Sequence, residues 1–116
     1  MKKKLVKDVA MDFAVDITRM CEEIHGRSVF VNQLLRSASS VGANAYEAQY
    51  AQSNADLVSK LEIALKECNE SEYWVLLLFR VGAISEEERD KQSYACSTIR
   101  RMLVASIKTL KAGLED

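Results

Sequence analysis

A polar stripe runs through the middle of this sequence at the spacing of an α-helix. Its residues are three or four positions apart, which places them on one face of a helix; they are Arg36, Ser40, Asn44 and Glu47. Such a face could bind a ligand or a partner. It could also form a hydrogen-bonded network between packed helices. We favour the network, because a buried charge persists only where an opposite charge pairs with it.

The other residue types that carry chemistry are few and scattered. His25 is the only histidine, and no cysteine, serine or carboxylate cluster is spaced to work with it. Cys21, Cys68 and Cys96 lack the spacing of a zinc site, so we expect three free, buried thiols. No nucleotide-binding, metalloprotease or hydrolase motif is present. The sequence therefore predicts no enzyme activity, no catalytic residue, no metal site, no cofactor and no small-molecule substrate.

The composition restricts the class of protein. The 116 residues suit a single domain, 1–116, and contain no proline and four glycines, which favours long, uninterrupted helices. Sixteen Lys and Arg against seventeen Asp and Glu give a net charge of -1, without the basic excess usual in nucleic-acid-binding domains. No apolar run is long enough to span a bilayer, and no signal-peptide core follows the basic start. We expect a soluble, cytoplasmic, all-α protein.

Apolar residues recur at helical steps in four segments, which predicts an antiparallel up-down-up-down four-helix bundle. The expected helices cover residues 3–24, 29–51, 54–81 and 86–111. The expected inner face of the last helix consists of Ile99, Met102, Leu103, Ser106 and Leu110. Ser53 and Ser85 should cap the third and fourth helices, each with an acidic residue three positions on. Gly26 and Gly82 should end the first and third helices, and Gly42 in mid-helix predicts a closely packed neighbour.

The second and third expected helices should fold back on each other about a short turn near Gln52. In that register the acidic residues near Arg36 are Glu67, Glu70 and Glu72, and Glu47 lies near Lys60. Opposite charges would therefore meet across the two helices. The predicted structural polar network consists of Arg36, Ser40, Asn44, Glu47, Lys60, Glu67 and Glu70.

The end of the third expected helix is apolar on every side. It reads YWVLLLF from Tyr73 to Phe79, and a helix that is apolar all round is buried all round. Each helix of a small four-helix monomer keeps one face in water, so other subunits should cover Tyr73, Trp74 and Leu77. The chain is therefore predicted to form a homo-oligomer.

Lysines gather near both ends of the sequence, which an up-down-up-down bundle brings to one pole. They are Lys2, Lys3, Lys4, Lys7, Lys108 and Lys111. In a ring of parallel subunits these lysines would form a basic rim that binds RNA or DNA phosphates without reading their sequence. The alternative is a solvated, lysine-rich terminus that only aids solubility.

Two consecutive stretches, QLLRSASSVGANAYEAQYAQS and DLVSKLEIALKECNESEYWVLLL, resemble a known family. It is the four-helix bundle protein family, whose members include proteins encoded in intervening sequences of bacterial 23S rRNA genes. Accessory proteins of diversity-generating retroelements are a related branch. The family pattern falls on Arg36, Ser40, Asn44, Glu47, Lys60, Glu67, Glu70, Tyr73 and Trp74.

The resemblance implies a left-handed bundle that assembles into a ring, with a pentamer expected, and many members lack a defined biochemical role. The retroelement branch binds nucleic acid and its reverse transcriptase through a basic surface, whereas this chain is slightly acidic. The proline usual between the first two helices is replaced by GRSVF. We predict a non-enzymatic, oligomeric bundle that binds RNA or a ribonucleoprotein through the basic rim. The alternative is a protein-interaction scaffold that binds no nucleic acid.

Overall fold

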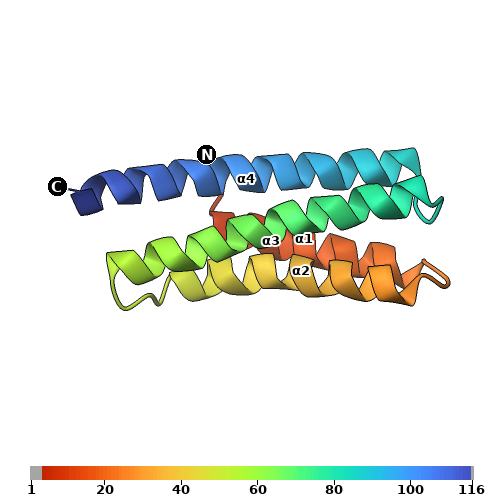
Figure 1. Cartoon of the computed structure of the whole chain (residues 1–116), viewed down its shortest axis with the longest axis horizontal. Helices are drawn as coiled ribbons and strands as arrows, with labels where there is room; N and C mark the ends of the chain where they lie inside the picture. The colour runs from red at the N-terminus through yellow and green to blue at the C-terminus, as the bar shows by residue number, and fades with distance from the viewer. Residues whose placement is uncertain (1–3, 116) are drawn as a thin grey trace.

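The computed structural model describes residues 4–115, which form four helices joined by short turns (Figure 1). The helices are α1 Val6–Glu22, α2 Ser28–Ala48, α3 Asn54–Arg80 and α4 Glu86–Glu115. Within residues 4–115 there is no strand, so the all-α prediction is confirmed for the part of the chain described. Four ends differ from the expectation by two residues or more: α1 begins later and ends at residue 22 instead of 24, α2 ends at 48 instead of 51, and α4 continues beyond residue 111. The late start of α1 and the extension of α4 expose part of α4.

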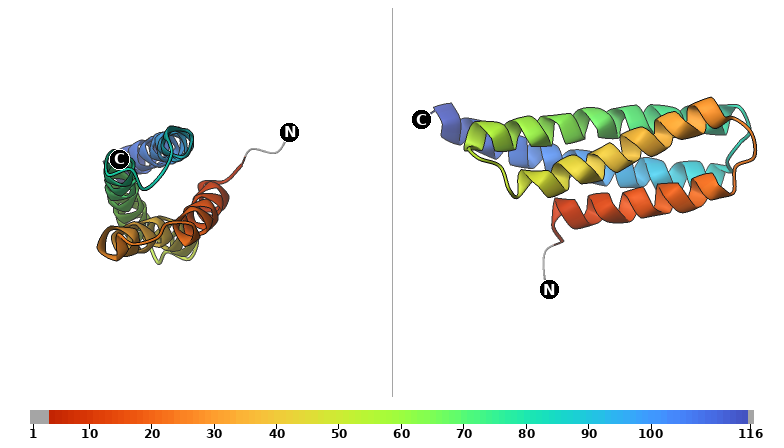
Figure 2. Two further views of the ribbon diagram at one scale, coloured as in Figure 1. Left: turned by 90° about the vertical axis from the view of Figure 1, so that its right-hand side faces the viewer. Right: turned by 90° about the horizontal axis from the view of Figure 1, so that it is seen from below.

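Consecutive helices run in opposite directions, as the short connections predicted. Each helix packs on its neighbour in the chain, and α1 also packs on α4, although less extensively than on α2. The four helices lie side by side in a body of 50 × 31 × 19 Å. Seen along the bundle, α1 and α4 flank its open side (Figure 2). The seam between α1 and α4 is therefore the weakest closure of the bundle.

Side-chain caps fix the starts of α3 and α4. The N–H of Asp56 donates to Ser53 Oγ at 3.1 Å, and Asp56 Oδ2 accepts the N–H of Gln52 at 3.1 Å. At the start of α4 both bonds join the same two residues: the Glu88 N–H donates to Ser85 Oγ at 3.1 Å, and the Ser85 N–H donates to Glu88 Oε1 at 3.2 Å. The capping box predicted for α4 is confirmed, and Ser53 caps α3 as predicted, although Asp56 reaches Gln52 one residue before the cap.

The two glycines expected at helix ends both adopt left-handed backbone conformations. Gly82 has φ +81°, and the N–H of Ala83 beyond it donates to the Leu78 carbonyl at 2.8 Å, which closes α3 as predicted. Gly26 has φ +77° but lies beyond the end of α1 at Glu22, so it shapes the connecting loop and does not terminate the helix. The prediction for Gly26 is wrong in this respect.

One apolar core runs through all four helices. Its largest fully buried apolar side chains are Phe13, Ile17, Leu34, Val41, Val75, Leu78, Ile99 and Leu103. On the expected inner face of α4, Ile99 and Leu103 are buried, whereas Met102, Ser106 and Leu110 are only half-buried. Met102, Ser106 and Leu110 lie on the side of α4 that stays uncovered where α4 extends past the start of α1, whereas Leu103 and Ile107 of the same stretch are buried on another side. This part of α4 is central to the candidate site.

Gly42 lies where the backbones of α1 and α2 come close. A Cβ atom at this position would lie 3.6 Å from the Ala10 carbonyl oxygen, an ordinary van der Waals distance that leaves room for one methyl group. The close packing predicted for Gly42 is therefore looser than expected. We expect Gly42→Ala to raise the free energy of unfolding by about 0.5–1 kcal/mol, because alanine favours the helix.

Urea denaturation would measure this change in stability. Gly113→Ala is the matched control, since Gly113 lies in α4 with nothing within 4 Å of an added Cβ atom. If Gly113→Ala raises the free energy of unfolding and Gly42→Ala lowers it, α1 and α2 approach each other more closely than the structure indicates.

Candidate functional site

The polar stripe on α2 meets carboxylates of α3 at Arg36. Arg36 Nη1 donates to Glu67 Oε2 at 3.1 Å, and Nη2 donates to the Glu70 carboxylate. The Glu67 side chain is 11% exposed and that of Arg36 is 50% exposed, so the guanidinium covers a nearly buried carboxylate. The predicted proximity of Arg36 to these two residues is confirmed.

Glu72 does not belong to this group. It accepts a hydrogen bond from Arg100 Nη2 of α4, and Arg100 Nε also donates to Asn69 Oδ1 at 2.8 Å. Two residues beyond Glu70, a helical side chain points about 200° further round the axis, and this rotation carries Glu72 to the α4 side. The expectation that Glu72 lies near Arg36 is therefore wrong.

The remainder of the stripe stays within its own helix or meets solvent. Asn44 Nδ2 donates to the carbonyl and hydroxyl oxygens of Ser40 at 2.9 and 3.1 Å. Glu47 and Lys60 line the same depression of about 430 Å³, where Asp56 also lies. Among the side chains described, no ion pair within 4.0 Å joins Glu47 to Lys60. The stripe therefore bridges α2 and α3 at its Arg36 end only.

A second polar contact between α2 and α3 was not anticipated from the sequence. Ser71 Oγ donates to Ser37 Oγ at 2.9 Å and lies 2.8 Å from the Glu67 carbonyl oxygen, while Ser37 Oγ donates to the Leu34 carbonyl at 3.2 Å. Both serines are fully buried. The available signal was Ser37 beside the apolar seam of α2, where a small residue lets two helix backbones approach. The hydroxyls satisfy each other, so this contact supports packing.

The aromatic cluster at the end of α3 is half covered by the single chain. Trp74 stacks on Phe30 of α2 with 6.1 Å between ring centroids, and Tyr73 meets it edge-on at 5.0 Å. Trp74 and Leu77 are half-buried, whereas Tyr73 is 56% exposed and Leu76 is 42% exposed. The apolar surface that remains in solvent is thus centred on Tyr73 and Leu76. The interface role of Tyr73, Trp74 and Leu77 stays a prediction.

The indole of Trp74 also contacts the Arg36 network. Trp74 Nε1 donates to Glu70 Oε2 at 3.1 Å. This hydrogen bond, together with the Arg36 guanidinium, lowers the pKa of the Glu70 carboxyl below its usual value. Glu70 therefore links the aromatic cluster to the polar network and remains ionised at neutral pH.

The three cysteines are free and buried, as expected. Burial raises the pKa of the Cys21 thiol to about 11. Cys68 Sγ donates to the Cys96 carbonyl oxygen at 3.4 Å, and the adjacent Cys68 thiol and burial raise the pKa of Cys96. Nucleophilic cysteine chemistry needs an accessible thiolate. Neither Cys21 nor Cys96 has that character.

The lysine-rich end of the bundle is partly neutralised by its own carboxylates. Lys2 and Lys3 lie outside the described residues. Three of the other four lysines lie within 4.0 Å of a carboxylate: Lys4 with Asp12 at 2.7 Å, Lys7 with Asp8 at 4.0 Å and Lys111 with Glu62 at 3.0 Å. Lys108 is exposed, and it forms no such ion pair with the side chains described, those of residues 4–113. The predicted rim therefore carries less free positive charge than its lysine content suggests.

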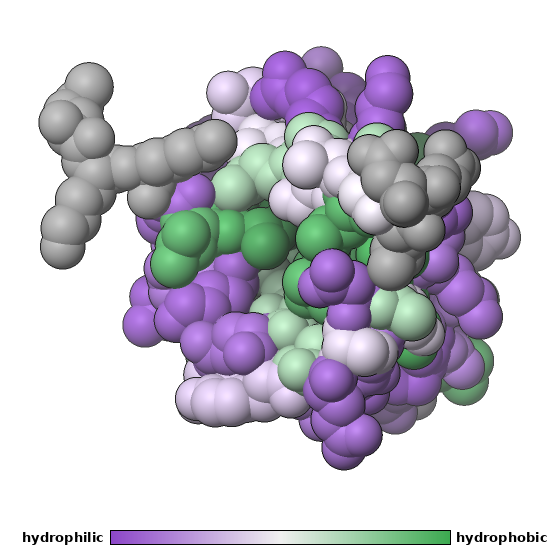
Figure 3. All heavy atoms as spheres, turned by 90° about the vertical axis from the view of Figure 1, so that its left-hand side faces the viewer, coloured by the Kyte–Doolittle hydropathy of each residue, from purple (hydrophilic) through white to green (hydrophobic). Residues whose placement is uncertain are grey.

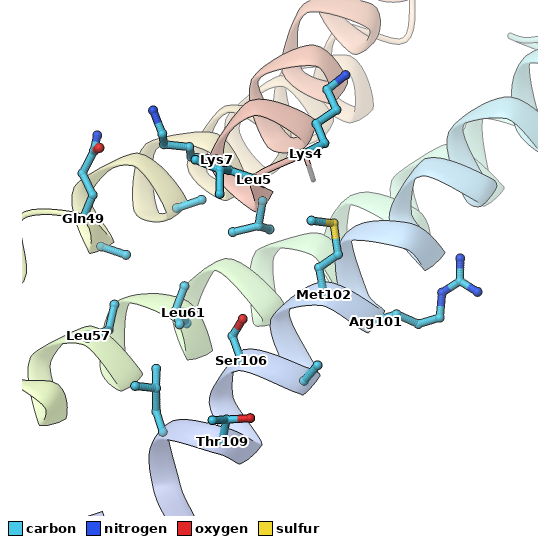
Figure 4. Close-up of a pocket in the computed structure, with 15 residues that line it drawn as sticks. Lys4, Leu5, Lys7, Gln49, Leu57, Leu61, Arg101, Met102, Ser106 and Thr109 are labelled. Atoms are coloured by element: carbon cyan, nitrogen blue, oxygen red, sulfur yellow. The ribbon is translucent and has the colours of Figure 1, made fainter. Parts of the chain in front are cut away.

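An open apolar groove of about 990 Å³ lies at the same end of the bundle (Figures 3 and 4). Its wall includes Leu5 before α1, Leu57 and Leu61 of α3, and Met102 and Ser106 of α4. Hydrophobic residues occupy the middle of this end of the molecule, with hydrophilic residues around them (Figure 3). This groove is larger than the depression beside Glu47 and Lys60 and is the candidate binding site considered below.

Cations border this groove. Lys4, Lys7 and Arg101 are among its lining residues, and none of the described lining residues is an Asp or a Glu. In Figure 4 the charged ends of Lys4 and Arg101 extend away from the apolar floor. The arrangement combines an apolar floor with a positively charged edge, which suits a partner that is apolar on one side and acidic beside it.

The described residues contain no group of three or more His, Cys, Asp or Glu side chains placed to hold a metal ion. None of the helices formed by residues 4–115 combines the length and hydropathy needed to cross a bilayer.

Comparison with known proteins identifies similar sequences and structures. A family model described as 23S rRNA-intervening sequence protein matches residues 2–105. A crystal structure of a protein with unknown function, from the S23 ribosomal protein family of Bacteroides thetaiotaomicron VPI-5482, is similar with a TM-score of 0.84 and 42% sequence identity. The match covers 89% of this chain and 95% of that chain. No curated protein matches this chain.

Proposed function

Because the chain belongs to the 23S rRNA-intervening sequence protein family, we propose that it is a non-enzymatic, homo-oligomeric bundle that acts by binding another macromolecule. The observation that carries this proposal is the apolar groove at the lysine-rich end, which the described part of the chain leaves open. The proposal includes a cytoplasmic location, a left-handed bundle and a pentameric ring. The last two follow from the family resemblance.

The polar residues support a non-enzymatic role. The Arg36 guanidinium is held by Glu67 and Glu70, and the Asn44 amide is held by Ser40. Side chains engaged in this way position helices and have little capacity left for a substrate. The stripe that could have formed a ligand site therefore contributes to packing between α2 and α3.

Exposed apolar side chains on α3 support self-association. Tyr73 and Leu76 are in solvent beside half-buried Trp74 and Leu77. The Trp74 N–H already has Glu70 as its acceptor, so a neighbouring subunit needs to supply only apolar contacts. Covering such side chains removes apolar surface from water, which favours association.

We expect light scattering of the purified protein to give a subunit number greater than one, with five expected from the family. Tyr73→Glu combined with Leu77→Glu should reduce it to one, because a carboxylate buried without a partner opposes association. Tyr94→Glu is the matched control, since Tyr94 is 71% exposed on α4. A wild-type protein that stays monomeric at micromolar concentration would remove the oligomer from the proposal.

The shape and chemistry of the groove favour a protein as the bound macromolecule. RNA phosphates are held by cations, yet most of the described lysines at this end already pair with carboxylates. The groove floor is apolar, with Leu57, Leu61 and Met102 among its residues. Apolar side chains of a protein partner would fill it, whereas a phosphate backbone would not.

RNA binding is the second candidate. It is favoured by Lys108, which has no carboxylate within 4.0 Å among the described side chains, and by the described groove lining, which contains no Asp or Glu. A mobility-shift assay with RNA at low salt tests it, using wild-type protein and Lys4→Glu combined with Lys108→Glu. RNA binding would be established if the wild-type protein shifts the RNA at low salt, the variant does not, and the shift disappears when the salt is raised from about 50 to 200 mM. No retention at low salt would exclude this candidate.

A further inference from the structure

The groove has the position that a longer α1 would occupy. Lys91 Nζ and Asp16 Oδ2, 3.9 Å apart, set the antiparallel register of α4 against α1. In this register the start of α1 at Val6 lies level with Arg101, and both residues line the groove. About 14 residues of α4 then extend past α1, which corresponds to about 20 Å of helix. Figure 2 shows α1 beginning well short of the end of α4.

Three helices surround this space, and all of them contribute small or apolar side chains to it. They include Ala45 and Ala48 of α2, Leu57 and Leu61 of α3, and Ala105 of α4. The backbone groups of these helices bond within each helix, so no strand edge is available for an extended peptide to join. A helix, which satisfies its own backbone, is the element that such a groove receives.

The charge along the groove determines what kind of helix fits. Lys4, Lys7 and Arg101 border it, and none of the described lining residues is an Asp or a Glu. Asp12 and Asp8, outside the lining, lie 2.7 Å from Lys4 and 4.0 Å from Lys7, so Arg101 is the cation of the lining whose charge is offset least. Arg101 forms no ion pair within 4.0 Å among the described residues, and its Nη2 reaches only the Thr98 hydroxyl at 3.5 Å. A helix with acidic residues beside its apolar face would place carboxylates against these cations. A basic helix would be repelled.

A second copy of this chain is a poor occupant for the groove. The apolar faces of its helices that point into the bundle are already buried in its own core and would have to leave it to enter another groove. The apolar side chains that α3 leaves exposed, Tyr73 and Leu76, are the ones proposed above to join subunits to each other. The proposed partner is therefore a different protein.

We propose that the groove binds an amphipathic helix of about four turns from a partner protein, with apolar residues at i, i+3, i+4 and i+7 and Asp or Glu on the flanks. This inference rests on the proposed binding function and specifies the partner's chemistry. Burial of the partner's apolar face supplies affinity. The acidic flanks supply orientation and selectivity.

Two labelled peptides of about 16 residues test the proposal. Both carry leucines at the stated spacing; one has glutamate on the flanks and the other has lysine. Fluorescence anisotropy with the full-length protein at low salt should show the acidic peptide binding at least about tenfold more tightly than the basic one. Equal binding of the two peptides, or binding of neither, would overturn the inference.

Protein variants locate the binding. Arg101→Glu should weaken the acidic peptide by about tenfold and strengthen the basic one, and Ser106→Trp should block both by filling the groove. Lys66→Glu is the matched control, because Lys66 is exposed on α3 away from the groove lining. Thermal unfolding must show that each variant is folded. Unchanged binding of the acidic peptide to folded Ser106→Trp would place the site elsewhere and overturn the proposal.

Light scattering on the same preparations separates this inference from the proposed function. If neither peptide binds but the protein is oligomeric and depends on Tyr73, the oligomer stands and the acidic-helix proposal fails. If Ser106→Trp lowers the subunit number, the groove is occupied by a second copy, and the proposal of a different partner is overturned.

Discussion

Replacement of Leu78 by alanine is expected to lower the free energy of unfolding by about 3–5 kcal/mol. Leu78 is fully buried in α3, the helix that packs against both α2 and α4. Removing its side chain loses the transfer free energy of the leucine atoms and leaves a cavity. The surrounding helices pack on several neighbours and cannot close in fully, so the cost should lie in the upper part of the range for such substitutions.

Leu76→Ala is the matched control, because Leu76 is on the same helix two residues earlier and is 42% exposed. Its effect on a single chain should stay below about 1 kcal/mol. Urea denaturation should be repeated at two protein concentrations, since a subunit interface over Leu76 would make its loss concentration-dependent. Equal losses for the two variants, independent of concentration, would contradict the placement of the core on the Leu78 side of α3.

Arg36→Ala is expected to lower the free energy of unfolding by about 1–3 kcal/mol. The substitution leaves the Glu67 carboxylate, which is 11% exposed, without its cation and beside Glu70. Two neighbouring carboxylates then repel each other, of which Glu67 is nearly buried and Glu70 is 32% exposed. We place the loss below that of a fully buried ion pair because the Arg36 side chain is itself 50% exposed, and solvent screens it.

The pH dependence distinguishes this electrostatic cause from lost packing. Folding lowers the pKa of Glu70, so its contribution to stability is present above the unfolded value of about 4.3 and is lost as the pH falls through the folded value. The cost of Arg36→Ala should therefore shrink between pH 7 and an acidic pH below the folded pKa of Glu70, because a protonated Glu70 carboxyl needs no cation. Arg36→Ala combined with Glu67→Gln should recover part of the loss at pH 7. If Arg36→Ala lowers the free energy of unfolding equally at both pH values, the loss arises from packing and not from charge.

The exposed lysines were a weaker guide to the binding surface than their number in the sequence suggested. The lysines near the two termini predicted a basic rim, but Lys4 and Lys111 lie beside Asp12 and Glu62. The groove beside them had no separate sequence signal, because its residues continue the apolar pattern of their helices. The groove exists because α1 begins at Val6, which leaves the last part of α4 without α1 beside it.

The sequence by itself determined the helices, their caps and the register of α2 on α3. These features depend on residues a few positions apart: Ser53 and Ser85 bond to N–H groups three residues on, and apolar residues repeat with the helical period. A short turn then allows little freedom in how two helices align. The meeting of Arg36 with Glu67 was predictable for this reason.

The tertiary structure alone decided which apolar residues remain uncovered and which charges pair across the bundle. Met102 and Leu110 continue the inner face of α4, yet they are half-buried because α1 begins too late to cover them. Glu72 pairs with Arg100 because of the rotation of α3 between its two neighbours. Helix periodicity gives the direction in which a side chain points, whereas the lengths and rotations of other helices determine what it meets there.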